Sequence, residues 1–118
     1  MIPGYINIAG ITKENRHDMI DYIVSCVNTC SGWIINHTMF SNLAIGINFQ
    51  IEAKDVNELL KLLNSNGLKL TKESIEILKN FPENIEEEYK HKEISAAINI
   101  TFVHNDPDLK IIIPAVPG

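Results

Sequence analysis

The chain has 118 residues, of which 45% are hydrophobic and 21% charged, so we expect a single globular domain over residues 1–118 rather than a disordered chain. The formal net charge is −5, and Arg16 is the only arginine. Nucleic-acid binding usually needs a clustered basic surface that displaces counterions, so we expect no nucleic-acid partner.

Membrane and secretion signals are missing from the sequence. No apolar run approaches the roughly 20 residues of a membrane span, and the first residues lack a basic segment followed by an apolar one. Cys26 and Cys30 are the only cysteines, and two thiols do not make a disulfide framework. We therefore expect a cytoplasmic protein that does not contact the membrane.

The first predicted elements are a strand and a helix. Residues 5–11 alternate between apolar and other side chains, with Ile6 and Ile8 pointing the same way. Thr12 is expected to cap a helix over residues 13–31, which carries one apolar stripe. Gly32 stands where a left-handed residue commonly ends a helix.

Two strands are predicted next. In residues 33–40 we expect Trp33, Ile35, His37 and Met39 to share one side. Residues 43–52 place five apolar side chains in strict alternation with small or polar ones, a pattern that is hard to reconcile with a helix.

The second half of the chain adds helices and two more strands. Asp55 is expected to cap a helix over 55–66, and Thr71 a short third helix that ends at Pro82. The charge-rich stretch 83–93 is interpreted as a solvated connector with a helical turn. Further strands are predicted at 94–104 and at 109–113.

This order predicts an α+β fold of the ferredoxin-like βαββαβ type. Because the strands alternate, we expect an antiparallel sheet with helices on one face and the other face open. The short third helix and the C-terminal strand are additions to that plan.

The same order resembles the ACT regulatory domain, in particular the variety found in glycine-cleavage repressor-type proteins. The resemblance covers residues 5–70 and, more loosely, 94–104. In that family a loop of the form Asp-Arg-Pro-Gly precedes the first helix, and here Asn15-Arg16-His17-Asp18 occupies that position. Only the arginine is kept. Asp18 replaces the glycine that lets a ligand lie against bare backbone, and its carboxylate would repel a ligand carboxylate and attract an ammonium.

The candidate ligand-binding residues are therefore Thr12, Asn15, Arg16, His17 and Asp18. A helix N-terminus presents free N–H groups to an anion, and Arg16 adds a donor fork for carboxylate or phosphate. The resemblance implies that an amino acid binds at this loop. The alternative is an ordinary polar first turn, since helix starts are commonly polar.

Cysteine and histidine side chains are candidates for metal ligands or catalytic groups. Cys26 and Cys30 are best interpreted as small buried hydrophobes, because nothing near them in sequence completes a set of metal ligands. His37 and His104 lie on different predicted strands and could meet as an acid/base pair, although a hydrogen-bonded, partly exposed histidine is the simpler interpretation. We expect no metal and no cofactor.

The open face of the predicted sheet carries unusually few charges. Ala44, Gly46, Asn48 and Gln50 on one strand face the same way, and residues 95–101 place Ser, Ala, Asn and Thr beside them. Interface cores are depleted of charge, so this face favours pairing with a second copy in a homodimer. The alternative is a plain solvent face, which would more often carry Lys and Glu.

Three hypotheses for function follow. The first is a non-catalytic, dimeric module that senses a small molecule, either an amino acid or a small anion, near residues 15–18. The second is a small dimeric enzyme with a pocket between sheet and helices, in which Trp33, His37 and His104 would be the groups to suspect. The third is a scaffold that binds only protein. No nucleophile–base pair or cofactor motif supports the enzyme.

Overall fold

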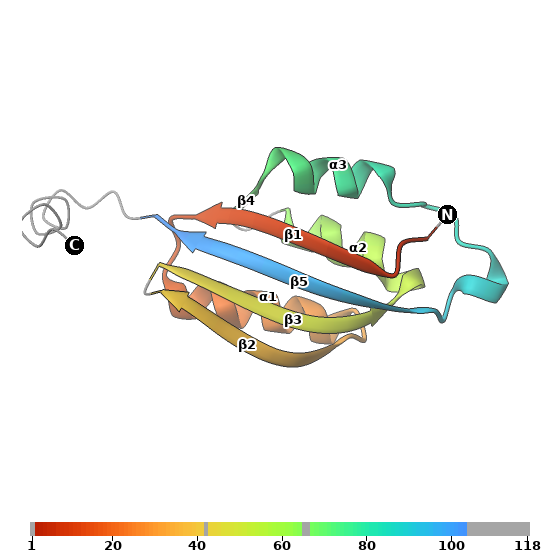
Figure 1. Ribbon diagram of the computed structural model, residues 1–118, viewed down its shortest axis with the longest axis horizontal. Helices are drawn as coiled ribbons and strands as arrows, with labels where there is room; N and C mark the ends of the chain where they lie inside the picture. The colour runs from red at the N-terminus through yellow and green to blue at the C-terminus, as the bar shows by residue number, and fades with distance from the viewer. Residues whose placement is uncertain (1, 42, 65–66, 104–118) are drawn as a thin grey trace, which may run out of the picture.

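The computed structural model describes residues 2–41, 43–64 and 67–103. Its elements alternate between strands and helices along most of the chain (Figure 1). In order they are β1 (Tyr5–Thr12), α1 (Arg16–Thr29), β2 (Trp33–Ser41), β3 (Ala44–Glu52), α2 (Ala53–Leu63), β4 (Leu68–Leu70), α3 (Lys72–Asn80), the 3₁₀ turn η1 (Glu87–Tyr89) and β5 (Glu93–Phe102).

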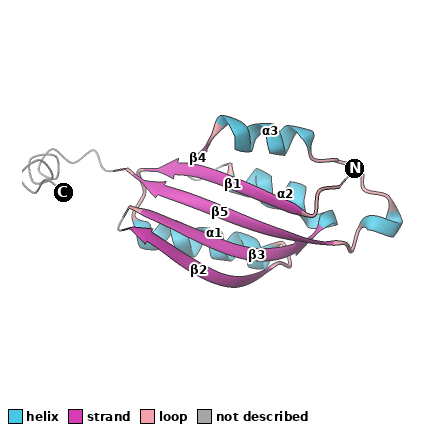
Figure 2. Cartoon of the chain, in the orientation of Figure 1, coloured by secondary structure: helices cyan, strands magenta, loops and turns pink. Residues whose placement is uncertain are grey.

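The α+β architecture is confirmed: one five-stranded sheet packs against helices (Figures 1 and 2). Helices α1 and α2 lie side by side behind the sheet, and α3 runs along the edge formed by β1 and β4. Alternating apolar residues of β1, β3 and β5 point towards the helices, and Ile8, Ile47 and Ile98 are fully buried among them. The predicted two-residue periodicity therefore gave the correct inward face for these three strands.

The strand order β2-β3-β5-β1-β4 does not confirm the ferredoxin-like arrangement. A ferredoxin-like sheet pairs its first and third strands, whereas here β5 lies between β3 and β1. The sheet is also not wholly antiparallel, because β5 pairs parallel to β1. The composition of β5 suits a central strand, since it buries Ala97 on one face and Ile98 on the other.

Strand β2 corrects the expectation that its odd-numbered residues share one side. The pairing of β2 with β3 shifts register between Ile34 and Asn36, which marks a β-bulge at Ile35. Trp33 pairs with Gln50 and so belongs to the open face, whereas His37 pairs with Ile47 and belongs to the helix side. One extra residue exchanges the two faces of a strand, because side chains alternate with a period of two.

Helix boundaries differ from the predicted ones. Asn15, not Thr12, caps α1, because its side chain accepts a hydrogen bond from the Asp18 N–H. The left-handed residue after α1 is Ser31, with φ of 61°, rather than Gly32.

Helix α2 begins earlier than predicted, after Glu52, and places Asp55 in its first turn. Thr71 does cap α3, as predicted, through a hydrogen bond from Ser74 N–H.

Two segments beyond the ferredoxin-like plan have different outcomes. The helical turn predicted in the connector is present as η1. The strand predicted at 109–113 lies outside the described residues. The sequence did not predict β4, a three-residue strand that pairs antiparallel with the end of β1.

Candidate functional site

The start of α1 holds three of the five predicted ligand-binding residues around one shallow pocket. Asn15, Arg16 and His17 line a cavity of about 400 Å³ together with Ile20. The Arg16 guanidinium donates to the Met39 sulfur at 2.7 Å, which ties the helix start to the edge strand β2. The pocket therefore combines a cationic side chain with apolar surface at a helix N-terminus, where backbone N–H groups favour an anion.

Thr12 and Asp18 do not line this pocket. The Thr12 side chain is buried, its hydroxyl donates to the Gly67 carbonyl at 2.9 Å, and it accepts from the Glu14 N–H at 3.0 Å. Thr12 thus holds the β1–α1 loop against the start of β4. Asp18 is exposed beyond the pocket lining, and its backbone N–H is occupied by the Asn15 side chain.

The groups suspected for catalysis are not brought together. Trp33 lies on the open face, and His37 lines a shallow groove beside α1 on the opposite side of the sheet. His104 lies outside the described residues.

Cys26 on α1 and Cys30 at its C-cap are both free and buried. Burial raises the pKa of both thiols, and for Cys30 the nearby carboxylates of Glu58 and Asp55 help to bring it to about 11. Over the described ranges, no group of three or more His, Cys, Asp or Glu side chains is placed to hold a metal ion.

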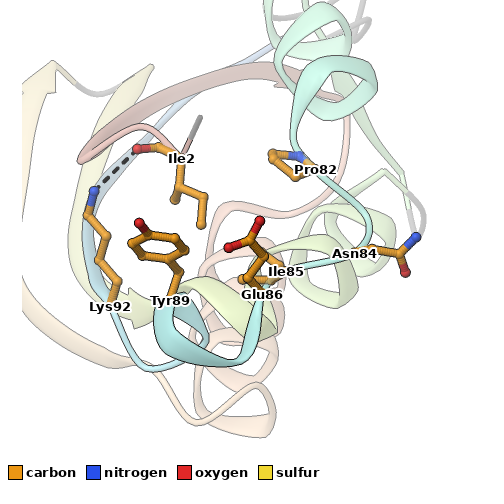
Figure 3. A pocket seen from close by; sticks show the side chains of 7 residues that line it. All are labelled: Ile2, Pro82, Asn84, Ile85, Glu86, Tyr89 and Lys92. Carbon is orange, nitrogen blue, oxygen red and sulfur yellow. Dashed lines mark hydrogen bonds between the residues drawn. The ribbon is translucent and has the colours of Figure 1, made fainter.

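A second pocket lies at the opposite end of the sheet, where the connector passes the N-terminal segment (Figure 3). It has a volume of about 370 Å³ and is lined by Ile2, Pro82, Asn84, Ile85, Glu86, Tyr89 and Lys92. Sequence reasoning missed it, because the contact of Ile2 with residues 82–92 is made only in the folded chain. The one available signal was Tyr89, an aromatic residue inside a run of charges.

The open face of the sheet extends over four neighbouring strands, and we define it by the side chains that point away from α1 and α2. They are Tyr5, Asn7, Ala9 and Ile11 on β1, Ser95, Ala97, Asn99 and Thr101 on β5, Ala44, Gly46, Asn48 and Gln50 on β3, and Trp33, Asn36, Thr38 and Phe40 on β2, whose Phe40 ring packs over Gly46.

None of these side chains is charged. Asn48 donates to Asn36, and Asn99 to Asn7, each at 2.7 Å, so the amides partly satisfy one another across the strands. The charged side chains on this face lie at its two ends, with Glu52 and Glu93 at one end and Lys69 at the other.

In the part of the chain that the structure describes, no helix is long and apolar enough to cross a membrane. No protein-family model matches the sequence, and no curated protein or solved structure is significantly similar to it.

Proposed function

We propose that the protein is a non-catalytic regulatory or ligand-binding module that works as a homodimer, with the open faces of two sheets stacked on each other. The observation that carries the proposal is the absence of charged side chains from the middle of that face, where it spans β1, β2, β3 and β5. A face left to solvent gains solubility from Lys and Glu, whereas the core of an interface is depleted of them.

The charges at the ends of the face favour a second copy as the partner. A two-fold axis across the strands lays each strand over its counterpart running in the opposite direction. The end of one copy that carries Glu52 and Glu93 then lies over the end of the other that carries Lys69. The acidic end of each copy thus lies towards the end of the other copy that carries the lysine, and the uncharged rows pack between the two ends.

Aromatic residues supply the anchors. Tyr5 and Trp33 lie at the two ends of one row of paired residues across the face, with Ser95 and Gln50 between them. Both side chains are large and remain exposed in a single chain, at 57% and 41%. Tyr and Trp are enriched among the residues that dominate binding energy at interfaces. We expect these two side chains to contribute most to the dimer.

The small-molecule site that we assign to this module is the pocket at the start of α1. Its Arg16 guanidinium and helix N-terminus fit a small anion or the carboxylate of an amino acid. Ligand binding regulates only if the two arrangements of the dimer bind the ligand with different affinity. The amino-acid ligand and the regulatory role follow the ACT resemblance, whereas the dimer rests on the sheet surface alone. The two free thiols fit a reducing cytoplasm.

Sedimentation equilibrium over a range of protein concentrations tests the dimer. Wild type should have twice the mass of one chain, and Ser95→Lys, an exposed substitution on the central strand β5, should shift the equilibrium to monomer. Glu88→Lys, an exposed change in the connector, is the matched control and should leave the dimer intact. A monomeric wild type would overturn the proposal.

A third variant distinguishes edge-to-edge pairing of two copies from stacking of their open faces. Ile35 lies at the bulge of the edge strand β2 and is exposed. If Ile35→Lys dissociates the dimer and Ser95→Lys does not, the copies pair through their edges and the stacked arrangement is wrong.

The ligand site is tested by thermal shift with the twenty amino acids, phosphate and sulfate. A ligand of the folded state raises the melting temperature by mass action, and Arg16→Gln should abolish that rise. A melting temperature that none of these compounds changes would remove the small-molecule part of the proposal and leave the dimer.

A further inference from the structure

The pocket between the N-terminal segment and the connector contains two opposite charges that do not neutralise each other (Figure 3). Glu86 points its carboxylate into the cavity, and Lys92 lies at the opposite rim, where its ammonium donates to the Ile2 carbonyl at 3.3 Å. Neither side chain takes part in an ion pair among the described residues. Lys90 and His91, which lie between Glu86 and Lys92 in the sequence, both do.

The rest of the lining is largely apolar. Ile2, Pro82 and Ile85 form part of the wall, and Ile2 and Ile85 also pack against the main core. The Tyr89 ring is 46% exposed and faces Ile2, whereas the Asn84 amide points away. A volume of about 370 Å³ is at the small end of the range for ligand pockets.

We propose that this pocket binds a small zwitterion with an apolar body. Glu86 takes the ligand's ammonium, Lys92 takes its carboxylate, and the body lies between Tyr89 and the aliphatic wall. A ligand with only one charge leaves the opposite protein charge without a partner, and a site built to pair polar groups discriminates strongly against an analogue that lacks one of them.

The pocket is held in shape by contacts that do not involve a ligand. Asn57 on α2 donates to the Pro82 carbonyl at 2.6 Å, and the Ala53 N–H donates to the Lys92 carbonyl at 2.8 Å. Both ends of the connector are therefore anchored to α2. A preformed pocket loses less entropy on binding than a loop that must first be ordered.

The site is separate from the one in the proposed function. It lies at the end of the sheet where β1 begins, whereas the start of α1 lies at the end where β1 finishes (Figure 1). The inference therefore stands whether or not a ligand binds near Arg16.

Isothermal titration calorimetry with three related probes tests the proposal. The probes are leucine, 3-methylbutylamine, which lacks the carboxylate, and 4-methylpentanoate, which lacks the ammonium. Leucine should bind with a measurable Kd, and each singly charged probe should bind about tenfold more weakly or worse.

Two variants assign the charges within the pocket. Glu86→Gln and Lys92→Gln are exposed changes, and each should weaken leucine binding about tenfold or more. Glu86→Gln should also weaken the binding of 3-methylbutylamine but not that of 4-methylpentanoate, and Lys92→Gln should do the reverse. Glu88→Gln, on the same turn but outside the lining, is the control and should bind as wild type does.

Three results would overturn the zwitterion assignment. They are no saturable binding of leucine, equal binding of all three probes, and leucine binding that survives both pocket substitutions. If leucine binding is lost in Arg16→Gln and retained in Glu86→Gln, the ligand occupies the start of α1, and this pocket is not its site.

Discussion

The backbone N–H of Ala9 donates a hydrogen bond of 2.7 Å to the hydroxyl of Ser74. Ser74 is buried on α3, and the Thr71 N–H in turn donates to the Ala9 carbonyl at 2.9 Å. Strand β4 pairs only with Gly10–Thr12, so the start of α3 satisfies the backbone of β1 where β4 no longer reaches it. A helix thus completes one edge of the sheet.

Removal of that hydroxyl should destabilise the fold. Ser74→Ala removes the acceptor of the part-buried Ala9 N–H, which should cost about 1–3 kcal/mol of unfolding free energy. Glu76→Ala, an exposed change on the same helix, should stay within about 0.5 kcal/mol of wild type. Urea denaturation measures both, and an unchanged stability for Ser74→Ala would contradict this role.

Thr12 should behave as a structural residue and not as a ligand. Thr12→Val keeps the shape of the side chain but removes both of its hydrogen bonds, to the Gly67 carbonyl and from the Glu14 N–H. We expect a loss of about 1–3 kcal/mol in unfolding free energy. The response of the folded protein to ligands should stay as in wild type, which thermal shift can check. If Thr12→Val has normal stability but no longer binds the ligand, Thr12 is a ligand-binding residue and this prediction is wrong.

The raised pKa of the Cys30 thiol predicts that the protein loses stability at alkaline pH. Burial, with smaller contributions from Glu58, Asp55 and Cys26, raises its pKa from 9.0 to about 11. Because the folded state favours the protonated thiol, this contribution is complete below pH 9 and is lost as the pH rises through about 11. The difference in unfolding free energy between wild type and Cys30→Ala should shrink by roughly 2 kcal/mol from pH 8 to pH 11. A difference that stays constant with pH would show that the thiol does not titrate as described.

Apolar residues of central and edge strands should differ sharply in their effect on stability. Ile98→Ala removes a fully buried side chain from the middle of the sheet and should cost about 2–5 kcal/mol. Ile35→Ala changes a side chain that is 52% exposed at the bulge of β2 and should cost less than about 1 kcal/mol. Chemical denaturation of the two variants, carried out on dilute protein, makes the comparison. Equal costs would place Ile35 in a packed environment.

The inward faces of the strands could be predicted from sequence, and their neighbours in the sheet could not. Alternation showed that Ile47 and Ile98 point inward, because in a strand stretch without a bulge a residue's face follows the local periodicity. The position of β5 between β3 and β1 depends on which strands pair, and no local pattern encodes that. The bulge at Ile35 escaped prediction for a related reason, since it exists only relative to the partner strand.

The candidate site was predicted in part. Asn15, Arg16 and His17 do share a pocket, because neighbouring residues at a helix start lie close together whatever the tertiary fold. Met39, which accepts a hydrogen bond from Arg16, is 23 residues away in sequence, and this contact could not be foreseen. The same holds for Ile2 and Lys92, which meet only because the connector returns to the N-terminal segment.

The stacked dimer is tested most directly by nuclear magnetic resonance on a mixture of isotope-labelled and unlabelled chains. Filtered nuclear Overhauser spectra of this mixture report only contacts between copies. We expect the Ala97 and Ala44 methyl groups to show contacts with the other chain, since both point out of the open face. Contacts between chains confined to β2, or none at concentrations where sedimentation shows a dimer, would contradict the stacking of open faces.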